Sequence, residues 1–81
     1  MKIKVRFFAS LKEIAGQSET IMDVPEDISC EHILQHLKEN IPALSEILES
    51  SLVAVNGTYV QKENFVTAED EVAIMPPVSG G

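Results

Sequence analysis

Disulfides, a basic surface and a membrane-spanning segment are all missing from this sequence, and each absence excludes a class of protein. The single cysteine, Cys30, cannot form an internal disulfide, which excludes a disulfide-rich secreted scaffold. The apolar runs fall well short of the roughly 20 residues that a membrane helix needs. Because no signal peptide opens the sequence either, we expect a cytoplasmic protein that does not bind membranes.

The charge balance is acidic. Thirteen acidic residues against six basic ones give a formal net charge of −7 at pH 7. Nucleic acids and anionic membranes select proteins with a basic surface, so neither is expected as a partner. If charge contributes to recognition, it favours a partner protein with a basic surface. With 81 residues, the chain is long enough for one small domain.

Side chains suited to catalysis or metal binding are also sparse. His32 and His36 lie four residues apart on a predicted helix, but no neighbouring cluster clearly supplies further ligands, so we expect two solvated histidines and no metal site. Cys30 lies in the apolar stripe of that helix, where burial makes a thiol unreactive. No glycine-rich phosphate loop follows a strand. The folded body is therefore expected to contain no catalytic side chains of its own.

What the sequence does contain is the alternating pattern of β-strands. Residues 2–8 place Ile3, Val5 and Phe7 on one face and mostly charged side chains on the other, which predicts a half-buried strand. Further strands are predicted at residues 18–24, 52–55, 58–60 and 71–75. The dipeptide Asn56-Gly57 predicts a tight hairpin turn between two of them, because both residue types tolerate a positive φ.

Two helices are predicted before the hairpin. Ser10 is placed to cap a short helix, with Glu13 at the position of a capping box and Gly16 as the stop. Ser29 is placed to cap the main helix, which reaches about residue 40. The apolar stripe of that helix consists of Ile33, Leu34, Leu37 and Ile41. Residues 43–49 predict one further helical turn.

This order of elements favours an α+β fold with one mixed sheet packed on one main helix. The first and last strands are separated by a long connection, so they can lie side by side and parallel. Such an arrangement is the β-grasp (ubiquitin-like) fold. We expect residues 1–75 to form this domain and residues 76–81 to form a flexible tail.

The predicted tail combines stiffness with a bare tip. It consists of Pro76, Pro77, Val78, Ser79, Gly80 and Gly81. Proline fixes φ and lacks an N–H, so the two prolines end the last strand and hold the tail away from the sheet. The two glycines carry no Cβ, so the tip can pass through a narrow channel. The only reactive group is then the terminal carboxylate of Gly81.

An apolar patch is predicted at the root of this tail. Phe8 and Met75 fall on the outward faces of the first and last strands, and Tyr59 on the hairpin is expected to join them. A contiguous exposed apolar patch marks an interface more often than scattered residues do. The alternative is that a loop or the short helix covers these side chains.

Six short stretches, spread over the chain, together match the pattern of one known family. They are Lys4–Ala9, Leu11–Glu13, Gly16, Val53–Asn56, Asp70–Ala73 and Pro76–Gly81. This set resembles the MoaD family of ubiquitin-like sulfur carriers, the small subunits of molybdopterin synthase. Gly-Gly alone is shared with ubiquitin and with the thiazole-pathway carrier ThiS, whereas Asp-Glu-Val-Ala followed by Pro-Pro-Val-Ser-Gly-Gly is more specific.

The resemblance implies a chemistry centred on Gly81. A MoeB-type activating enzyme is expected to use ATP to adenylate the carboxylate of Gly81, and a sulfur donor then displaces AMP to leave a thiocarboxylate. The tail next enters a MoaE-type large subunit, in an expected heterotetramer, and donates sulfur to cyclic pyranopterin monophosphate. Two such transfers form the dithiolene of molybdopterin. No cofactor is bound, and the catalytic side chains belong to the partners.

The same resemblance assigns roles to the other residues. Gly80 lets the tip through a tight channel, and Pro76 and Pro77 hold the tail off the sheet. Phe8, Tyr59 and Met75 are expected to form the contact that both partners use. Three alternatives stay open: a carrier for thiazole synthesis or tRNA thiolation, a ubiquitin-like modifier of lysines, and a β-grasp binding module whose tail is idle.

Overall fold

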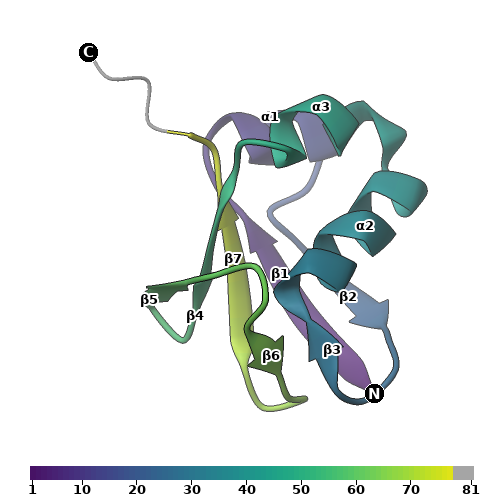
Figure 1. Ribbon diagram of the computed structural model, residues 1–81. Coiled ribbons are helices and arrows are strands. Elements are labelled where there is room, and N and C mark those ends of the chain that lie inside the picture. Colours follow the sequence, from purple (N-terminus) through teal and green to yellow (C-terminus); the bar gives the residue numbers. More distant parts are fainter. Residues whose placement is uncertain (78–81) are drawn as a thin grey trace.

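The protein is a five-stranded mixed sheet with its helices on one face (Figure 1). The computed structural model describes residues 1–77. The strands of the main sheet are β1 (Lys2–Phe7), β2 (Glu19–Asp23), β4 (Leu52–Val55), β5 (Thr58–Val60) and β7 (Glu71–Met75), in the order β2-β1-β7-β4-β5. The helical segments are α1 (Ser10–Ala15), α2 (Cys30–Asn40), the 3₁₀ turn η1 (Pro42–Leu44) and α3 (Ser45–Leu48).

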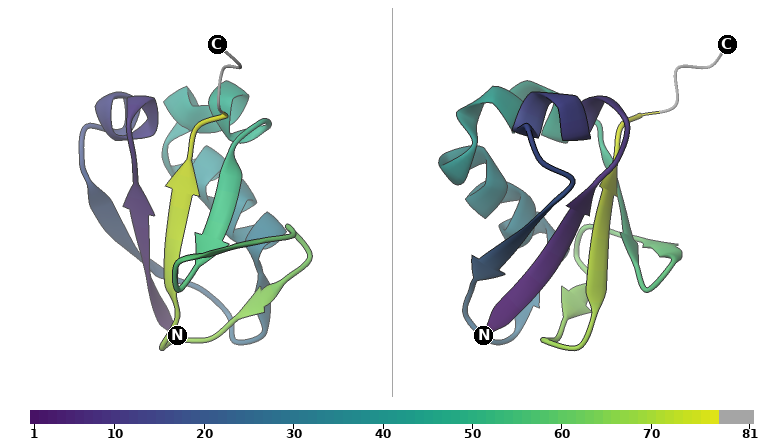
Figure 2. Two further views of the ribbon diagram at one scale, coloured as in Figure 1. Left: turned by 90° about the vertical axis from the view of Figure 1, so that its left-hand side faces the viewer. Right: turned by 180° about the vertical axis from the view of Figure 1, so that it is seen from behind.

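The centre of the sheet is the parallel pair of β1 and β7, which confirms the predicted β-grasp arrangement. Val5 lies beside Val72 and Phe7 beside Ile74 in this pairing. All other neighbours in the main sheet are antiparallel. β7 ends at the same end of the sheet where α1 and α3 lie, and residues 76 and 77 follow it there (Figures 1 and 2).

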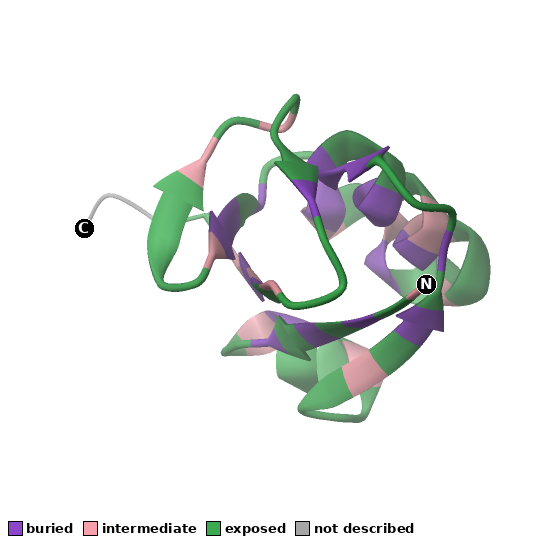
Figure 3. Ribbon diagram, turned by 90° about the horizontal axis from the view of Figure 1, so that it is seen from below, coloured by how far each residue is buried: buried purple, intermediate pink, exposed green. Residues whose placement is uncertain are grey.

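The core lies between the inner face of the sheet and α2. The alternation predicted for β1 is confirmed, since Ile3, Val5 and Phe7 are at most 2% exposed. Figure 3 shows buried positions alternating with exposed ones along the strands. The helical stripe is confirmed at Ile33, Leu34 and Leu37, all at most 4% exposed, while Ile41 at the end of α2 is half-buried. Burying each such side chain contributes about 1.5–3 kcal/mol.

The start and end of α2 follow the predicted signals. Ser29 is the N-cap, and its Oγ accepts a hydrogen bond from the backbone N–H of His32 at 3.3 Å. The helix ends at Asn40, just before Pro42. The helical turn predicted after the proline is present as η1 and α3, where Leu44 and Leu48 are fully buried.

The predicted capping box of α1 is wrong. Ser10 is the first helical residue; the N-cap is Ala9, with φ 51°, and no side chain caps the helix. The backbone explains why no serine cap is needed. The carbonyl of Phe8 accepts from the N–H of Leu11 at 3.1 Å, and the carbonyl of Ala9 accepts from Lys12 at 3.1 Å. The stop is confirmed, since Gly16 adopts the left-handed conformation with φ 73°.

A second, very small sheet was not predicted. It pairs β3 (Ile28–Ser29) with β6 (Phe65–Val66), and Ile28 and Val66 are both buried. The segment before β6 also caps α2 from a distance. The carbonyls of Asn64 and Lys62 accept the N–H groups of Cys30 and Glu31 at 2.9 and 2.8 Å. These are the N-terminal N–H groups that a helix cannot satisfy by itself.

The predicted hairpin is confirmed. Asn56 and Gly57 have φ 53° and 85°, and Val55 lies opposite Thr58 across the turn.

The strand predicted at residues 18–24 is one residue shorter at each end. Within residues 1–77, none of the helices combines the length and apolar character needed to cross a bilayer.

Candidate functional site

The three side chains predicted to form the patch do lie together on the outward face of the sheet. β1 ends at Phe7, one residue earlier than expected, but the N–H of Phe8 still donates to the carbonyl of Ile74 at 3.2 Å, which holds Phe8 beside the end of β7. The hydroxyl of Tyr59 donates to Sδ of Met75 at 3.4 Å. Phe8 is 39% exposed and Tyr59 61%, so no loop or helix covers them.

Leu52 completes this patch, and the sequence reasoning missed it. Leu52 lies opposite Met75 in the pairing of β4 with β7 and is 42% exposed. The run Leu-Val-Ala-Val is apolar on both faces, so its composition does not indicate which residues face outward. The register does, because alternation along β4 sends Val53 inward and Leu52 outward. Phe8, Leu52, Tyr59 and Met75 are called the apolar patch below.

Small residues form the floor beside the apolar patch. Ala54 and Ala73 lie opposite each other in neighbouring strands, and Tyr59 lies across from Ala54 on the next strand. Ala54 is only 4% exposed. The small side chains of Ala54 and Ala73 leave the larger side chains of the apolar patch as the main apolar groups on this face.

Basic residues border the apolar patch on the β1 side. Arg6 lies with Cζ 5.5 Å from the ring centroid of Phe8, and its Nη1 donates to Oε1 of Glu71 at 3.0 Å. Lys2 and Lys4 share the outward face of β1 with Arg6. Each of these three cations lies near a carboxylate: Lys2 near Asp23, Lys4 near Glu19 and Arg6 near Glu71. A partner that covers the patch would therefore meet one ion pair on this side, Arg6 with Glu71.

The end of β7 links the apolar patch to residues 76–81. Pairing with β4 includes Met75, and Pro76 then lacks the N–H that a further ladder bond would need. Pro76 is half-buried and Pro77 is exposed. The predicted tail residues Val78, Ser79, Gly80 and Gly81 lie outside the described residues. The chain therefore leaves the sheet at Met75, directly beside the patch (Figure 2).

Neither histidine belongs to a metal-binding group. His32 is exposed on α2, with Nδ1 3.2 Å from Oγ of Ser29, and His36 is half-buried. Across residues 1–77, no three His, Cys, Asp or Glu side chains are grouped so as to hold a metal ion. Cys30 is fully buried, and burial raises the pKa of its thiol, with the charge of Asp70 adding to the rise. Its burial is the one that the apolar stripe predicts, and a raised pKa disfavours the thiolate, which is the reactive form.

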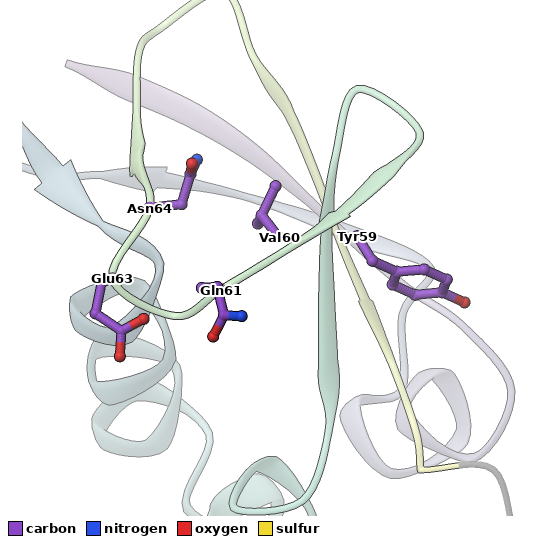
Figure 4. Close-up of a pocket in the computed structure, with 5 residues that line it drawn as sticks. All are labelled: Tyr59, Val60, Gln61, Glu63 and Asn64. Carbon is purple, nitrogen blue, oxygen red and sulfur yellow. The ribbon is translucent and has the colours of Figure 1, made fainter.

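The surface hollow next to the hairpin does not resemble a catalytic cleft. It encloses about 600 Å³ and is lined by Tyr59, Val60, Gln61, Glu63 and Asn64. In Figure 4 these side chains point in different directions, and Tyr59 points away from Val60 on the opposite side of β5. A binding site for a small molecule instead has polar groups that converge on one position.

The sequence model of the ThiS family matches residues 5–81, which is nearly the whole chain. The chain belongs to the ThiS family. The molybdopterin synthase sulfur carrier subunit of Dictyostelium discoideum is 39% identical over 83 residues, a match that covers 99% of this chain and 96% of that relative. The resemblance to the small subunits of molybdopterin synthase is confirmed by this match.

Solved structures of similar proteins share the fold of this ThiS family member. The crystal structure of small archaeal modifier protein 1 from Haloferax volcanii superposes with a TM-score of 0.88 at 30% identity and covers 100% of both chains. A putative molybdopterin converting factor subunit 1 from Pyrococcus furiosus has a TM-score of 0.85 at 28% identity, covering 96% of this chain and 99% of that chain. The β-grasp fold is therefore shared over nearly the full length.

Proposed function

We propose that this protein is the sulfur carrier subunit of a molybdopterin synthase and that Gly81 carries the sulfur as a C-terminal thiocarboxylate. The observation that supports this most directly is the position of the apolar patch, which surrounds the point where the chain leaves β7. A carrier must present its C-terminal residue to an enzyme and must also be gripped by that enzyme. An uncovered apolar face beside the start of the tail meets both needs.

The proposed chemistry begins with activation of Gly81. The carboxylate attacks the α-phosphate of ATP, releases pyrophosphate and becomes an acyl-adenylate, a step that the activating enzyme catalyses. A sulfur donor then displaces AMP and leaves the thiocarboxylate. Its sulfur is a soft nucleophile that attacks cyclic pyranopterin monophosphate in the large subunit and forms a thioester with it. Water then cleaves the acyl–sulfur bond, which leaves the sulfur on the pterin and restores the Gly81 carboxylate. Two such transfers complete the dithiolene. Gly80 and Gly81 present no Cβ to the enclosing channel.

The folded body contributes recognition. The tail must enter both the MoeB-type activating enzyme and the MoaE-type large subunit, so both are expected to bind the apolar patch from which it departs. The two complexes are then mutually exclusive, and the carrier must dissociate from one before it binds the other. Moderate affinity suits such a shuttle better than a permanent interface does.

Intact mass spectrometry tests the carrier chemistry. The purified protein is incubated with an activating enzyme, ATP and a sulfur source. The expected result is a mass gain equal to replacing one oxygen with one sulfur, localised to the C-terminal peptide. The matched control is a variant that lacks Gly80 and Gly81. No gain with several competent activating enzymes would contradict the proposal and favour a binding module whose tail is idle.

A second experiment identifies the pathway. The thiocarboxylated protein is mixed with a MoaE-type subunit and cyclic pyranopterin monophosphate, and in parallel with a thiazole synthase and its substrates. Molybdopterin should form in the first mixture only. Product in the second mixture alone would make this a thiazole-pathway carrier.

One observation favours a second candidate function. The Haloferax volcanii protein that superposes at a TM-score of 0.88 is a small archaeal modifier protein. A modifier is joined to lysine side chains of other proteins through its C-terminal glycine, and that reaction passes through the same acyl-adenylate. Peptides carrying Gly81 in an isopeptide bond to lysine, found in extracts of the native host, would show this function.

A further inference from the structure

The edge of the sheet at β2 has features of a second docking site. β2 is the outermost strand of the order β2-β1-β7-β4-β5, and in residues 1–77 it pairs with β1 alone. The pairing runs through Glu19 to Asp23 in one continuous register without a bulge. Natural sheets protect exposed edges with lysine, proline or bulges. β2 has no lysine, proline or bulge, and its charged side chains are the carboxylates of Glu19 and Asp23.

The hydrogen-bond pattern shows which backbone groups are available at this edge. Just outside the strand, the N–H of Phe7 donates to the carbonyl of Ser18 at 2.9 Å, and at the other end Val24 donates to Met1 at 2.8 Å. Hydrogen-bonded pairs recur every second residue in an antiparallel ladder. Thr20 and Met22 therefore direct their N–H and C=O groups toward β1. The free edge is formed by the backbone groups of Glu19, Ile21 and Asp23.

The side chains at this edge define two different faces. Ile21 is 64% exposed on the outward face, and it lies between the carboxylates of Glu19 and Asp23, which share that face. On the inward side, Thr20 and Met22 border a groove of about 500 Å³ that extends to Leu37 in α2 and Ile41 just after it. Gln17 and Asn40 also line this groove. An added strand would thus meet carboxylates on its outer face and a groove of mixed apolar and polar lining on its inner face.

The carboxylates on β2 disfavour a second copy of the chain as the strand that binds to this edge. An antiparallel β2–β2 pair centred on Ile21 would place Glu19 of each copy opposite Asp23 of the other. Like charges directly opposite each other destabilise a strand pair. The ion pairs that these carboxylates already make are long and exposed. Lys4 lies 3.9 Å from Glu19, and both Lys2 and the N-terminal ammonium of Met1 lie 3.8 Å from Asp23. Exposed pairs of this kind contribute little stability.

We propose that the β2 edge binds an extended segment of another protein by strand addition, and that this segment carries basic residues on both sides of an apolar centre. In an antiparallel register, its two basic side chains lie opposite Asp23 and Glu19, and its central residue packs against Ile21. The residues between them point into the groove toward Leu37 and Ile41. Main-chain hydrogen bonds supply affinity, and the alternating side chains supply specificity.

This site is separate from the apolar patch. β1 lies between β2 and β7, and the views in Figure 2 show β2 on the side of the sheet away from β4 and β5. A protein bound at the β2 edge can therefore stay attached while enzymes exchange at the patch. Strand addition at β2 needs only the folded body, so it can occur whether or not Gly81 carries sulfur.

Nuclear magnetic resonance titration of the full-length ¹⁵N-labelled protein tests the site. The probe is the peptide acetyl-Lys-Val-Ile-Val-Lys-amide. Two controls accompany it: acetyl-Lys-Lys-Val-Ile-Val-amide, with the same composition, and acetyl-Glu-Val-Ile-Val-Glu-amide, with reversed charge. The amide shifts of Glu19, Ile21 and Asp23 should change most and saturate. Binding of either control peptide should be weaker by about tenfold, because cross-strand charge pairs are lost or reversed.

Variants separate strand addition from general attraction between opposite charges. Ile21→Pro removes an N–H that faces the free edge and should weaken binding by at least about tenfold, whereas Ile21→Val keeps that N–H and should bind normally. The double variant Glu19→Lys, Asp23→Lys leaves the backbone untouched and should prefer the Glu-flanked peptide. If the proline variant fails to fold, this double variant still tests whether the carboxylates select the peptide.

Three results would overturn the proposal. The first is a failure of selective binding: either the three peptides bind equally, or the probe does not bind at millimolar concentration. The second is a set of shifts centred on Phe8 and Met75, which would place the peptide on the apolar patch. The third is a dimer of the free protein in sedimentation equilibrium whose dilution shifts the β2 amides, which would make a second copy the occupant.

Discussion

The two faces of the main sheet are built from the same strands but differ in what covers them. On the inner face Val5, Val72 and Ile74 are fully buried, and α2 packs over them. On the outer face Phe8 and Tyr59 are 39% and 61% exposed. Both faces are apolar near the end of β7, but among residues 1–77 only the inner face is covered by other elements. Burial, and with it stability, is thus concentrated on the inner face, whereas the outer face presents the apolar patch that we propose as the partner contact.

The largest expected effect is on the inner face. Ile74→Ala should lower the free energy of unfolding by about 2–5 kcal/mol, because it removes fully buried methylene and methyl groups and leaves a cavity. The matched control is Met75→Ala, one residue along β7 but on the outer face, which should cost less than about 1 kcal/mol. Urea denaturation monitored by circular dichroism measures both. Equal losses would show that the two faces contribute alike.

The next effect is on recognition. Met75→Arg should weaken binding to a MoaE-type subunit by at least about 30-fold, as expected for a central contact residue, while the stability of the variant stays near that of the wild type. Phe8→Arg should behave in the same way, and both should also weaken binding to the activating enzyme.

Isothermal titration calorimetry with each purified partner measures these affinities. Ile21→Arg is the control, since Ile21 is exposed on the same outer face but lies at β2, away from the apolar patch. If either patch variant bound both partners normally, the patch would not be the shared contact.

A smaller effect is expected at Gly80. Gly80→Ala should slow thiocarboxylate formation or sulfur transfer by about tenfold, because a Cβ at this position obstructs a narrow channel and restricts the backbone. Its melting temperature should not change. Single-turnover assays followed by mass spectrometry give the rate, and Ser79→Ala serves as a control. Normal turnover of Gly80→Ala would remove the role assigned to this glycine.

The smallest effect is expected at Asp70, in the turn that precedes β7. The N–H of Thr67, which donates to Oδ2 of Asp70 at 2.8 Å, and the side chain of Asn56, which donates to Oδ1 at 2.9 Å, lower the pKa of Asp70. A lowered folded-state pKa stabilises the protein above the unfolded pKa of about 4, and this contribution is lost as the pH falls through the folded value.

The Asp70→Asn variant tests this linkage. It should be slightly less stable than the wild type at pH 7, and the difference should shrink toward zero as the pH falls below about 4. The change is expected to be small because the carboxylate is near the surface, where water screens charge. Urea denaturation at several pH values measures it. A difference that stays constant with pH would assign the effect to lost hydrogen bonds.

Sequence reasoning located most of the apolar patch but could not complete it. Phe8, Tyr59 and Met75 could be grouped because residues 2–8 and 71–75 alternate clearly and because a β-grasp places those strands side by side. Leu52 was missed, since the run at residues 52–55 is apolar on both faces. The capping box at Ser10 failed because the carbonyl of Ala9 satisfies the first turn, a bond that depends on a left-handed residue no propensity predicts.

The sequence by itself determined the features that depend on neighbours along the chain. These are the alternation of β1, the cap of α2 at Ser29, the turn at Asn56-Gly57 and the end of the last strand at Pro76. Only the tertiary structure decided the capping of α2 by Asn64 and the free backbone groups of β2. Both depend on which distant strands meet and in which register, and contacts across a sheet leave no local pattern in the sequence.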